Sequence, residues 1–302
     1  MSMKAPNKLI QVLLVYLLCI FVNFAYAKEI ITITGSTTVA PIVKASESQF
    51  QSQTGISIII RAKGSSAGIE AVAKGEANIG MASRPLRQSE QQQWPQLKTI
   101  TLAEDAIVLI VNSKNPISNL TRQQVNELYS GRYNNWEQLD KELNFNLLKN
   151  QHIQLISKKE GHGSLSAFLS LFGLSKPNIQ GRKMYFKSAD ASQFSSLGAS
   201  QVDTAKQAMT LVARLKNSIA YESLGTLETL KTDPLYTQIK ILNIDDIKPT
   251  VASVTLGEYP IKRSLSLVID QNKTNPHVTQ YLQYMSSPEG KEHITTHGYI
   301  AK

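Results

Sequence analysis

The sequence predicts an α/β protein built from two lobes. Three times, an apolar run suited to a buried strand leads through a turn rich in Gly, Ser or Thr into a stretch with helical periodicity. With 302 residues, of which 42% are hydrophobic, the chain is long enough to form two cores. The three turns are Gly35-Ser36-Thr37-Thr38, Gly64-Ser65-Ser66-Ala67-Gly68 and Gly161-His162-Gly163-Ser164.

Residues 28–110 alternate between predicted strands and predicted helices. Apolar runs predict strands over residues 30–33, 56–61, 77–81 and 106–111. Between them we expect helices over 39–53, 68–74 and 88–97, with Gly55 and Gly75 ending the first two. This alternation predicts a mostly parallel sheet that is covered by helices on both faces.

The rest of the chain continues the alternation less regularly. Thr121 is a candidate N-cap for a helix over 122–129. We expect strands over 153–156, 219–221 and 265–269, and helices over 164–172, 205–215, 278–285 and 289–296. Residues 173–204 are rich in Gly, Ser, Ala and Lys, which favours loop and weak helix.

The N-terminal segment has the composition of a cleaved export signal. Lys4 and Lys8 precede an apolar run over 9–24, and Ala25-Tyr26-Ala27 has the small-x-small form of a cleavage site. The run is short for a membrane span of about 20 residues, although a retained anchor stays an alternative. Cys19, the only cysteine, lies in this segment, and a lipoprotein is a second alternative. We therefore predict a signal peptide over 1–27 and a periplasmic location.

Composition limits the chemistry of the mature chain. Without a cysteine it has no disulfide and no thiolate metal site. The formal net charge of the whole chain is +9, but the basic residues are scattered rather than gathered in a run. This distribution argues against a nucleic-acid-binding arm and is compatible with attraction of a small anion.

The three turns share a property that points to anion binding. The start of a helix carries unpaired N–H groups and a partial positive charge. Glycine allows close approach of the backbone to a ligand, and Ser or Thr adds hydroxyl donors. If the three helix starts face one point, they form a site for a small oxyanion.

The same turns belong to an ordered set of motifs that resembles the periplasmic phosphate-binding proteins of ABC importers. The similarity extends over nearly the whole mature chain, and the order of the motifs makes it specific. The matching segments are residues 35–42, 64–68, 75–86, 105–112, 115–116, 120–136, 219–225, 259–261, 287–290 and 298–299.

This resemblance implies a two-lobed periplasmic-binding-protein fold of type II, with the ligand cleft between the lobes. It places residues 28–104 plus 261–302 in lobe 1 and residues 105–260 in lobe 2, with crossings near 103–106 and 258–262. It also implies a monomeric receptor that captures inorganic phosphate and delivers it to an inner-membrane ABC permease. Catalysis, a cofactor and a resident metal are not expected.

The resemblance also suggests individual ligand-binding residues. Thr37, Thr38, Ser65 and Ser66 match phosphate-contacting positions in the first two motifs, and a role as plain helix caps is the alternative for the threonines. Arg84 stands where one branch of the family has an aspartate. Its guanidinium is suited to a two-pronged contact with an oxyanion, and a rim salt bridge to an acid such as Glu104 is the alternative.

The motif of the second lobe departs most from the family pattern of Arg-x-x-Gly-Ser-Gly-Thr. Lys158 replaces the arginine, His162 replaces a serine, and Ser164 replaces a threonine, while Gly163 is retained. Lysine lacks the planar fork of arginine, and histidine changes its charge near pH ~6.5. We expect all four residues to contact the ligand, although a surface or packing role stays open for His162.

Other functions remain as alternatives. The same site suits a different oxyanion or a phosphate sensor, and a hydrolase on this scaffold is a less favoured interpretation. A structural envelope protein would bind no small anion. Metal binding is not expected, because His293 and His297 lie four residues apart without a third ligand at a matching spacing.

Overall fold

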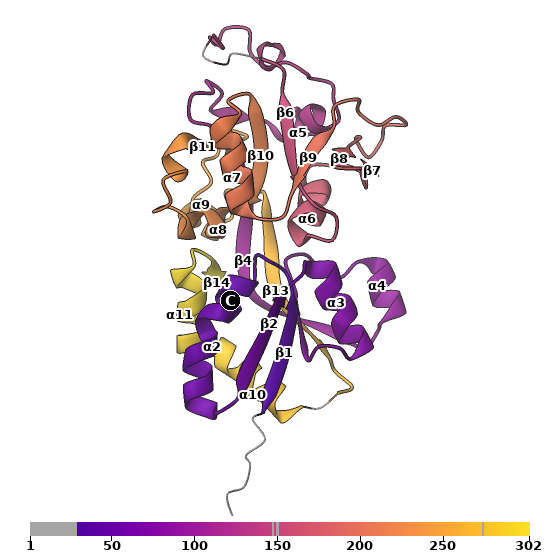
Figure 1. The fold of residues 1–302 in the computed structure, drawn as a ribbon, viewed down its shortest axis with the longest axis vertical. Helices are drawn as coiled ribbons and strands as arrows, with labels where there is room; N and C mark the ends of the chain where they lie inside the picture. Colours follow the sequence, from indigo (N-terminus) through magenta and orange to yellow (C-terminus); the bar gives the residue numbers. More distant parts are fainter. Residues whose placement is uncertain (1–28, 147, 149–150, 274) are drawn as a thin grey trace, which may run out of the picture.

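The computed structural model describes residues 29–302 apart from residues 147, 149, 150 and 274. The predicted signal peptide therefore lies outside the described residues. Two α/β lobes lie end to end along the long axis of the molecule, and two strands, β4 and β13, run from one lobe to the other (Figure 1). The prediction of a two-lobed α/β fold is confirmed.

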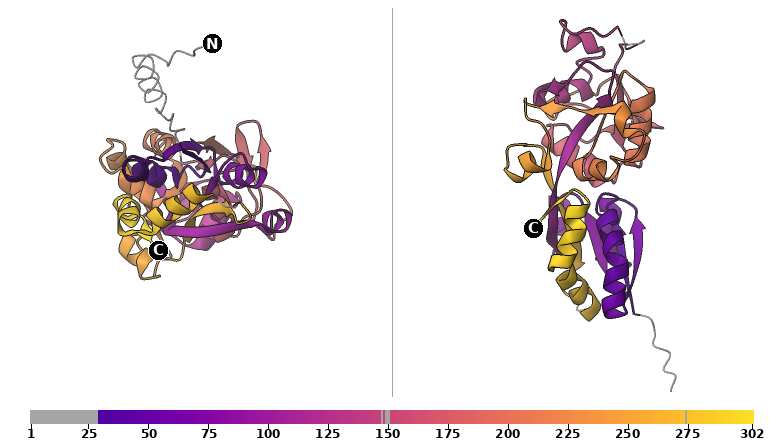
Figure 2. Two further views of the ribbon diagram at one scale, coloured as in Figure 1. Left: turned by 90° about the horizontal axis from the view of Figure 1, so that it is seen from below. Right: turned by 90° about the vertical axis from the view of Figure 1, so that its left-hand side faces the viewer.

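Lobe 1 has a sheet with helices on both faces. The strands lie in the order β2 (Ser57–Ala62), β1 (Ile30–Gly35), β3 (Ile79–Ala82), β13 (Lys262–Asp270) and β4 (Leu97–Asn112), with β14 (Ile300–Ala301) pairing with β4. One face packs against α2 (Ala40–Thr54), α10 (Pro276–Ser286) and α11 (Pro288–Thr296). The other packs against α3 (Ser65–Lys74), with α4 (Gln88–Gln93) on the same side (Figure 2).

Lobe 2 continues the sheet from the second half of β4. The strands follow in the order β10 (Ser218–Ser223), β6 (Gln154–Lys158), β9 (Ala199–Val202), β8 (Lys183–Tyr185) and β7 (Asn178–Gln180), and β11 (Ile239–Ile241) also pairs with β4. A separate two-stranded sheet joins β5 (Asn119–Leu120) and β12 (Asn243–Ile244). The helices are α5 (Arg122–Tyr129), α6 (Gly163–Leu171), α7 (Ala205–Arg214), α8 (Leu224–Thr229) and α9 (Val251–Thr255), with 3₁₀ turns η1 (Trp136–Gln138) and η2 (Tyr236–Gln238).

Strand β4 changes partners where the lobes meet. Its first half pairs with β13 in antiparallel register as far as Ala106, opposite Lys262, and its second half pairs with β10 from Ile107 onward. The apolar cores divide at the same place: residues between 106 and 261 form one cluster, and buried apolar residues on either side of that range form two others. We propose that the lobes divide as 29–104 plus 261–302 and 105–260.

Two expectations from the sequence were wrong, and one is correct only in part. The pairs β1–β2 and β1–β3 are parallel, as predicted for residues 28–110, but the whole sheet is mixed because the strands that pair with β4 all run antiparallel to it. The predicted helix over 88–97 ends at Gln93, and β4 begins at Leu97 as a strand whose first residues are half-exposed. Residues 173–204 hold the short strands β7, β8 and β9, which span too few residues for a clear period.

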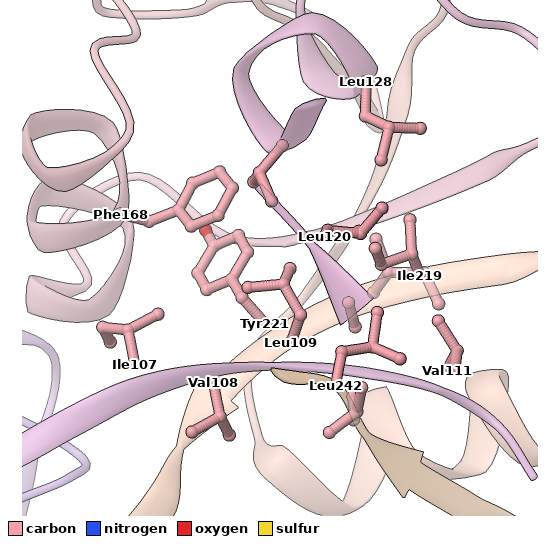
Figure 3. Close-up of a cluster of buried hydrophobic side chains, with 14 of the residues drawn as sticks. Ile107, Val108, Leu109, Val111, Leu120, Leu128, Phe168, Ile219, Tyr221 and Leu242 are labelled. Atoms are coloured by element: carbon pink, nitrogen blue, oxygen red, sulfur yellow. The ribbon is translucent and has the colours of Figure 1, made fainter. Parts of the chain in front are cut away.

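An aromatic stack in lobe 2 joins its core to the end of β6. Phe168 of α6 lies flat on Tyr221 of β10, with ring centroids 3.9 Å apart and an interplanar angle of 6° (Figure 3). The Tyr221 hydroxyl lies 2.8 Å from Ser157 Oγ and accepts a hydrogen bond from the Lys158 N–H at 3.1 Å. The core therefore fixes the backbone at the point where β6 leads into the third Gly-containing turn.

Among the residues described, no helix is both long enough and apolar enough to span a bilayer.

Removing this stack should destabilise the protein. We expect Phe168→Ala to lower the free energy of unfolding by about 3–5 kcal/mol, because Phe168 is fully buried. Phe194→Ala is the matched control, since Phe194 is 42% exposed, and it should cost about 1 kcal/mol or less. Denaturant unfolding measures both values, and equal losses would contradict the packing described.

Candidate functional site

The starts of α2, α3 and α6 meet where the two lobes touch, and we call this region the lobe junction. The Ser66 N–H of lobe 1 donates to the carbonyl of Gly161 in lobe 2 at 3.3 Å. Thr37 Oγ1 lies 3.4 Å from His162 Nδ1 across the same boundary. The three Gly-containing turns are thus brought together, as the sequence predicts for a shared oxyanion site.

Two glycines allow this close approach. Gly64 has φ +91°, and a Cβ there would lie 2.9 Å from the carbonyl oxygen of Gly161. A Cβ on Gly163 would collide with Ser65 Oγ and Ser83 Oγ of the opposite lobe. Larger residues at these two positions would hold the lobes apart.

Helices α3 and α6 begin without a side-chain cap from their N-cap residues, Gly64 and His162, within the described part of the chain. Other helices are different: α5, α7, α8, α9, α10 and α11 are each capped by a Ser, Thr or Asn side chain, although α4 is not. Just before α2, Ser36 Oγ accepts from the N–H groups of Thr38 and Val39. Helices α3 and α6 therefore lack side-chain caps where they meet at the boundary between the lobes, and the Ser66 N–H of α3 donates across it to Gly161.

The hydroxyl groups of the first lobe have partners other than their own helix starts. Thr37 and Thr38 do not cap α2, because its N-cap residue is Val39, which makes no side-chain cap hydrogen bond. Thr38 Oγ1 accepts from Arg263 at 3.3 Å. Ser65 is fully buried, and its Oγ accepts from the Ser83 N–H at 3.1 Å.

Arg84 is held by an acid on its own lobe. Its two terminal nitrogens each donate to a different oxygen of Glu90, at 2.7 Å, and one of them also donates to Ser66 Oγ at 3.1 Å. Burial alone would raise the pKa of the Glu90 carboxyl, but hydrogen bonds from Arg84 and from the Arg87 N–H outweigh it and lower the pKa. Glu104 instead pairs with Lys262 and Lys302.

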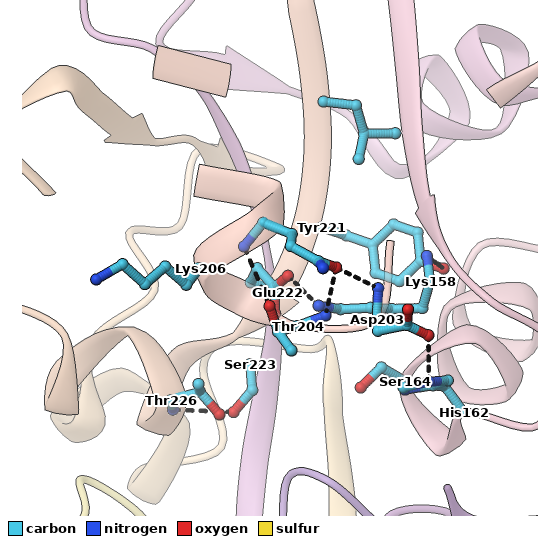
Figure 4. Close-up of polar contacts among 12 residues, drawn as sticks. Lys158, His162, Ser164, Asp203, Thr204, Lys206, Tyr221, Glu222, Ser223 and Thr226 are labelled. Carbon is cyan, nitrogen blue, oxygen red and sulfur yellow. Dashed lines mark hydrogen bonds and ion pairs between the residues drawn. The ribbon is translucent and has the colours of Figure 1, made fainter. Parts of the chain in front are cut away.

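Lys158 also has a carboxylate partner. It is buried at the end of β6 and forms an ion pair with Glu222 of β10 (Figure 4). Its ammonium charge is therefore balanced within lobe 2. Ser164, two residues beyond His162, is buried at the start of α6.

His162 lies between charged neighbours at the lobe junction. Its Nε2 is 3.9 Å from Asp203 Oδ1, and its side chain is 11% exposed. Burial lowers the pKa of His162, the positive charges of Lys158 and Lys159 lower it further, and Asp203 opposes them. The lowered pKa favours the neutral imidazole, which can donate one hydrogen bond and accept another.

One buried ion pair at the lobe junction escaped the sequence analysis. Arg263 of β13 donates to Asp105 of β4 from Nε at 3.1 Å and from a terminal nitrogen at 2.9 Å. The signal was an arginine two residues after the Tyr259-Pro260-Ile261 motif, just before the strand expected from Leu265. Among the residues that the structure covers, no group of three His, Cys, Asp or Glu side chains could hold a metal ion.

The fold and the paired helix starts define a two-lobed binding protein, and the chain belongs to the PBP superfamily, whose domain model matches residues 24–289. Among curated proteins, the phosphate-binding protein PstS of Borreliella burgdorferi is 26% identical over 277 residues, covering 90% of each chain.

Two solved structures resemble the whole fold. A putative phosphate ABC transporter substrate-binding protein with bound phosphate from Clostridium perfringens aligns with a TM-score of 0.74 and 25% identity. An ABC-type phosphate transport receptor from Vibrio cholerae aligns with a TM-score of 0.71 and 27% identity. In both cases the alignment covers 91% of this chain and 100% of the other.

The lowered pKa of His162 gives a test of its environment. We expect its imidazole to titrate below 6.5 in an NMR titration of the ligand-free protein, because burial and the two lysines disfavour the charged ring. The neutral ring then stabilises the fold above pH ~6.5, and this contribution is lost as the pH falls through the lowered pKa. Relative to His162→Gln, the wild-type protein should lose stability between about pH 7 and pH 5. A His162 pKa above 6.5 would contradict the described surroundings.

Proposed function

We propose that this protein is an exported receptor that binds inorganic phosphate at the lobe junction and delivers it to an inner-membrane ABC permease. The observation that carries the proposal is the meeting of α3 and α6 across the lobes, at helix starts that lack a side-chain cap and lie beside buried hydroxyls of Thr38, Ser65 and Ser164. Such a group of donors suits a tetrahedral oxyanion. The phosphate-binding relatives support phosphate as that anion.

The binding site that we propose comprises nine residues predicted from the sequence. Backbone N–H groups and hydroxyls would supply most donors, and the side chains of Arg84, Lys158 and His162 line the same region. The nine are Thr37, Thr38, Ser65, Ser66, Arg84, Lys158, His162, Gly163 and Ser164. Because lobe closure would bury the anion and present a closed surface to a permease, we also propose that the protein acts as a periplasmic monomer without catalytic activity.

A different oxyanion is the second candidate. Three buried carboxylates at the lobe junction are already paired: Glu90 with Arg84, Asp105 with Arg263, and Glu222 with Lys158. Arg84 stands where one branch of the family has an aspartate, and a guanidinium cannot accept a hydrogen bond from a protonated phosphate oxygen. This would weaken discrimination against fully ionised anions such as sulfate. Calorimetric titration with phosphate, sulfate, arsenate, molybdate and tungstate separates the candidates.

Substitution of Gly163 tests whether the anion is bound between closed lobes. We expect Gly163→Ala to lower phosphate affinity by about 100-fold or more, because its methyl group would collide with Ser65 Oγ and Ser83 Oγ and prevent closure. Gly257→Ala is the matched control, since a Cβ there meets no atom within 4 Å, and the strain of its φ of +77° should lower stability without blocking closure of the lobes. Isothermal titration calorimetry measures both affinities. Absence of heat from wild-type protein with phosphate near neutral pH would reject phosphate, and unchanged affinity in Gly163→Ala would reject this location.

A further inference from the structure

The Arg263–Asp105 pair is placed differently from the other ion pairs of the lobe junction. Both residues lie on the strands that cross between the lobes, and they are register partners in the β13–β4 pairing. Their side chains are 2% and 1% exposed, so this guanidinium is almost completely removed from solvent. An arginine is buried in this way only with strong partners, and Asp105 is one of them.

Arg263 also reaches the helix starts of both lobes. One terminal nitrogen donates to Ser164 Oγ of α6 at 2.8 Å, and the other donates to Thr38 Oγ1, just before α2, at 3.3 Å. A hydroxyl that accepts from a guanidinium keeps its own O–H free to donate elsewhere. The pair of hydroxyls is therefore arranged to donate toward a common acceptor beside the guanidinium.

The other two buried cations each bond within a single lobe. Arg84 donates to Glu90 and Ser66, which both belong to lobe 1. Lys158 pairs with Glu222 in lobe 2. Of these three cations, Arg263 is the one with hydrogen-bond partners in both lobes, and it has the planar fork that Lys158 lacks.

Asp105 is fixed from two sides. Its Oδ2 accepts both bonds from Arg263, and its Oδ1 accepts from the Gly225 N–H at the start of α8 at 3.2 Å. These bonds hold the carboxylate against the guanidinium edge formed by Nε and one terminal nitrogen, and they leave an N–H of the other terminal nitrogen, which donates to Ser164, for a ligand. Asp105 therefore sets the orientation of Arg263 without needing to contact a ligand itself.

We propose that Arg263 is the principal side-chain cation that binds the anion, and that Asp105 is the residue that positions it. This inference rests on the proposed function and specifies its chemistry. The terminal nitrogen that donates to Ser164 has a second N–H, and this group binds the anion together with the Ser164 and Thr38 hydroxyls, so that the bound anion joins the crossing strand to both lobes. Arg263 thus fills the role that the sequence motif would assign to an arginine at position 158.

Calorimetric titration with inorganic phosphate tests this role in two variants of Arg263 and one control. Arg263→Lys keeps the charge but removes the fork, and Arg263→Gln removes the charge. Arg122→Lys is the matched control, because Arg122 forms an arginine–aspartate pair with Asp245 on the surface of lobe 2. Thermal unfolding without phosphate establishes that each variant is folded.

We expect phosphate affinity to fall by about 10-fold in Arg263→Lys and about 100-fold in Arg263→Gln, and to change less than about 2-fold in Arg122→Lys. A folded Arg263→Gln variant that binds phosphate within 2-fold to 3-fold of the wild type overturns the inference alone. A wild-type protein that binds no phosphate overturns the proposed function and this inference with it.

Asp105→Asn provides a second readout that a purely structural ion pair would not give. In this variant Arg263 keeps its charge but loses the carboxylate that orients it. Phosphate affinity should therefore fall by about 10-fold in folded Asp105→Asn, and phosphate should raise its melting temperature less than that of the wild type. A folded Asp105→Asn variant with wild-type phosphate affinity would show that Asp105 does not position a ligand-binding group.

Discussion

The antiparallel pairing of β4 with β13 is the constraint on which the rest of the structure depends. These two strands connect the lobes, and each is part of a sheet core in lobe 1. Asp105 and Arg263 lie on them at the crossing, while the three Gly-containing turns approach from the lobes on either side. The orientation of the two lobes relative to β4 and β13 therefore determines which residues make contact at the lobe junction.

Charge balance is the second feature that organises the lobe junction. Each buried cation there has a carboxylate partner, because an isolated buried charge is strongly unfavourable. Such pairs add little net stability, but removal of one partner typically costs about 3–5 kcal/mol. Because carboxylates already balance these cations, an anion bound among them is held chiefly by directed hydrogen bonds from N–H groups and hydroxyls. Site geometry, more than net charge, would then decide which anion binds.

The sequence predicted the parts of this arrangement that depend on local pattern. A helix start can be recognised from a few adjacent residues, as at Gly64, Ser65 and Gly163. All three lie at the lobe junction, as expected. The partners of the buried cations could not be read in the same way, because Asp105 and Arg263 are 158 residues apart. The sequence suggested Glu104 as an ion-pair partner for Arg84, but the structure pairs Arg84 with Glu90. The packing of α4 decides which acid Arg84 meets, and the sequence alone does not show that packing. The strands β7, β8 and β9 could not be predicted, because three or four residues are too few to show the alternation of polar and apolar side chains that marks a strand.

A crystal structure of the protein grown with phosphate tests the central claim most directly. We expect tetrahedral density at the lobe junction, within hydrogen-bond distance of the N–H groups at the starts of α3 and α6 and of the Ser164 hydroxyl. The two lobes should remain in contact through Ser66 and Gly161. An empty lobe junction at saturating phosphate, with the anion bound elsewhere or absent, would contradict it.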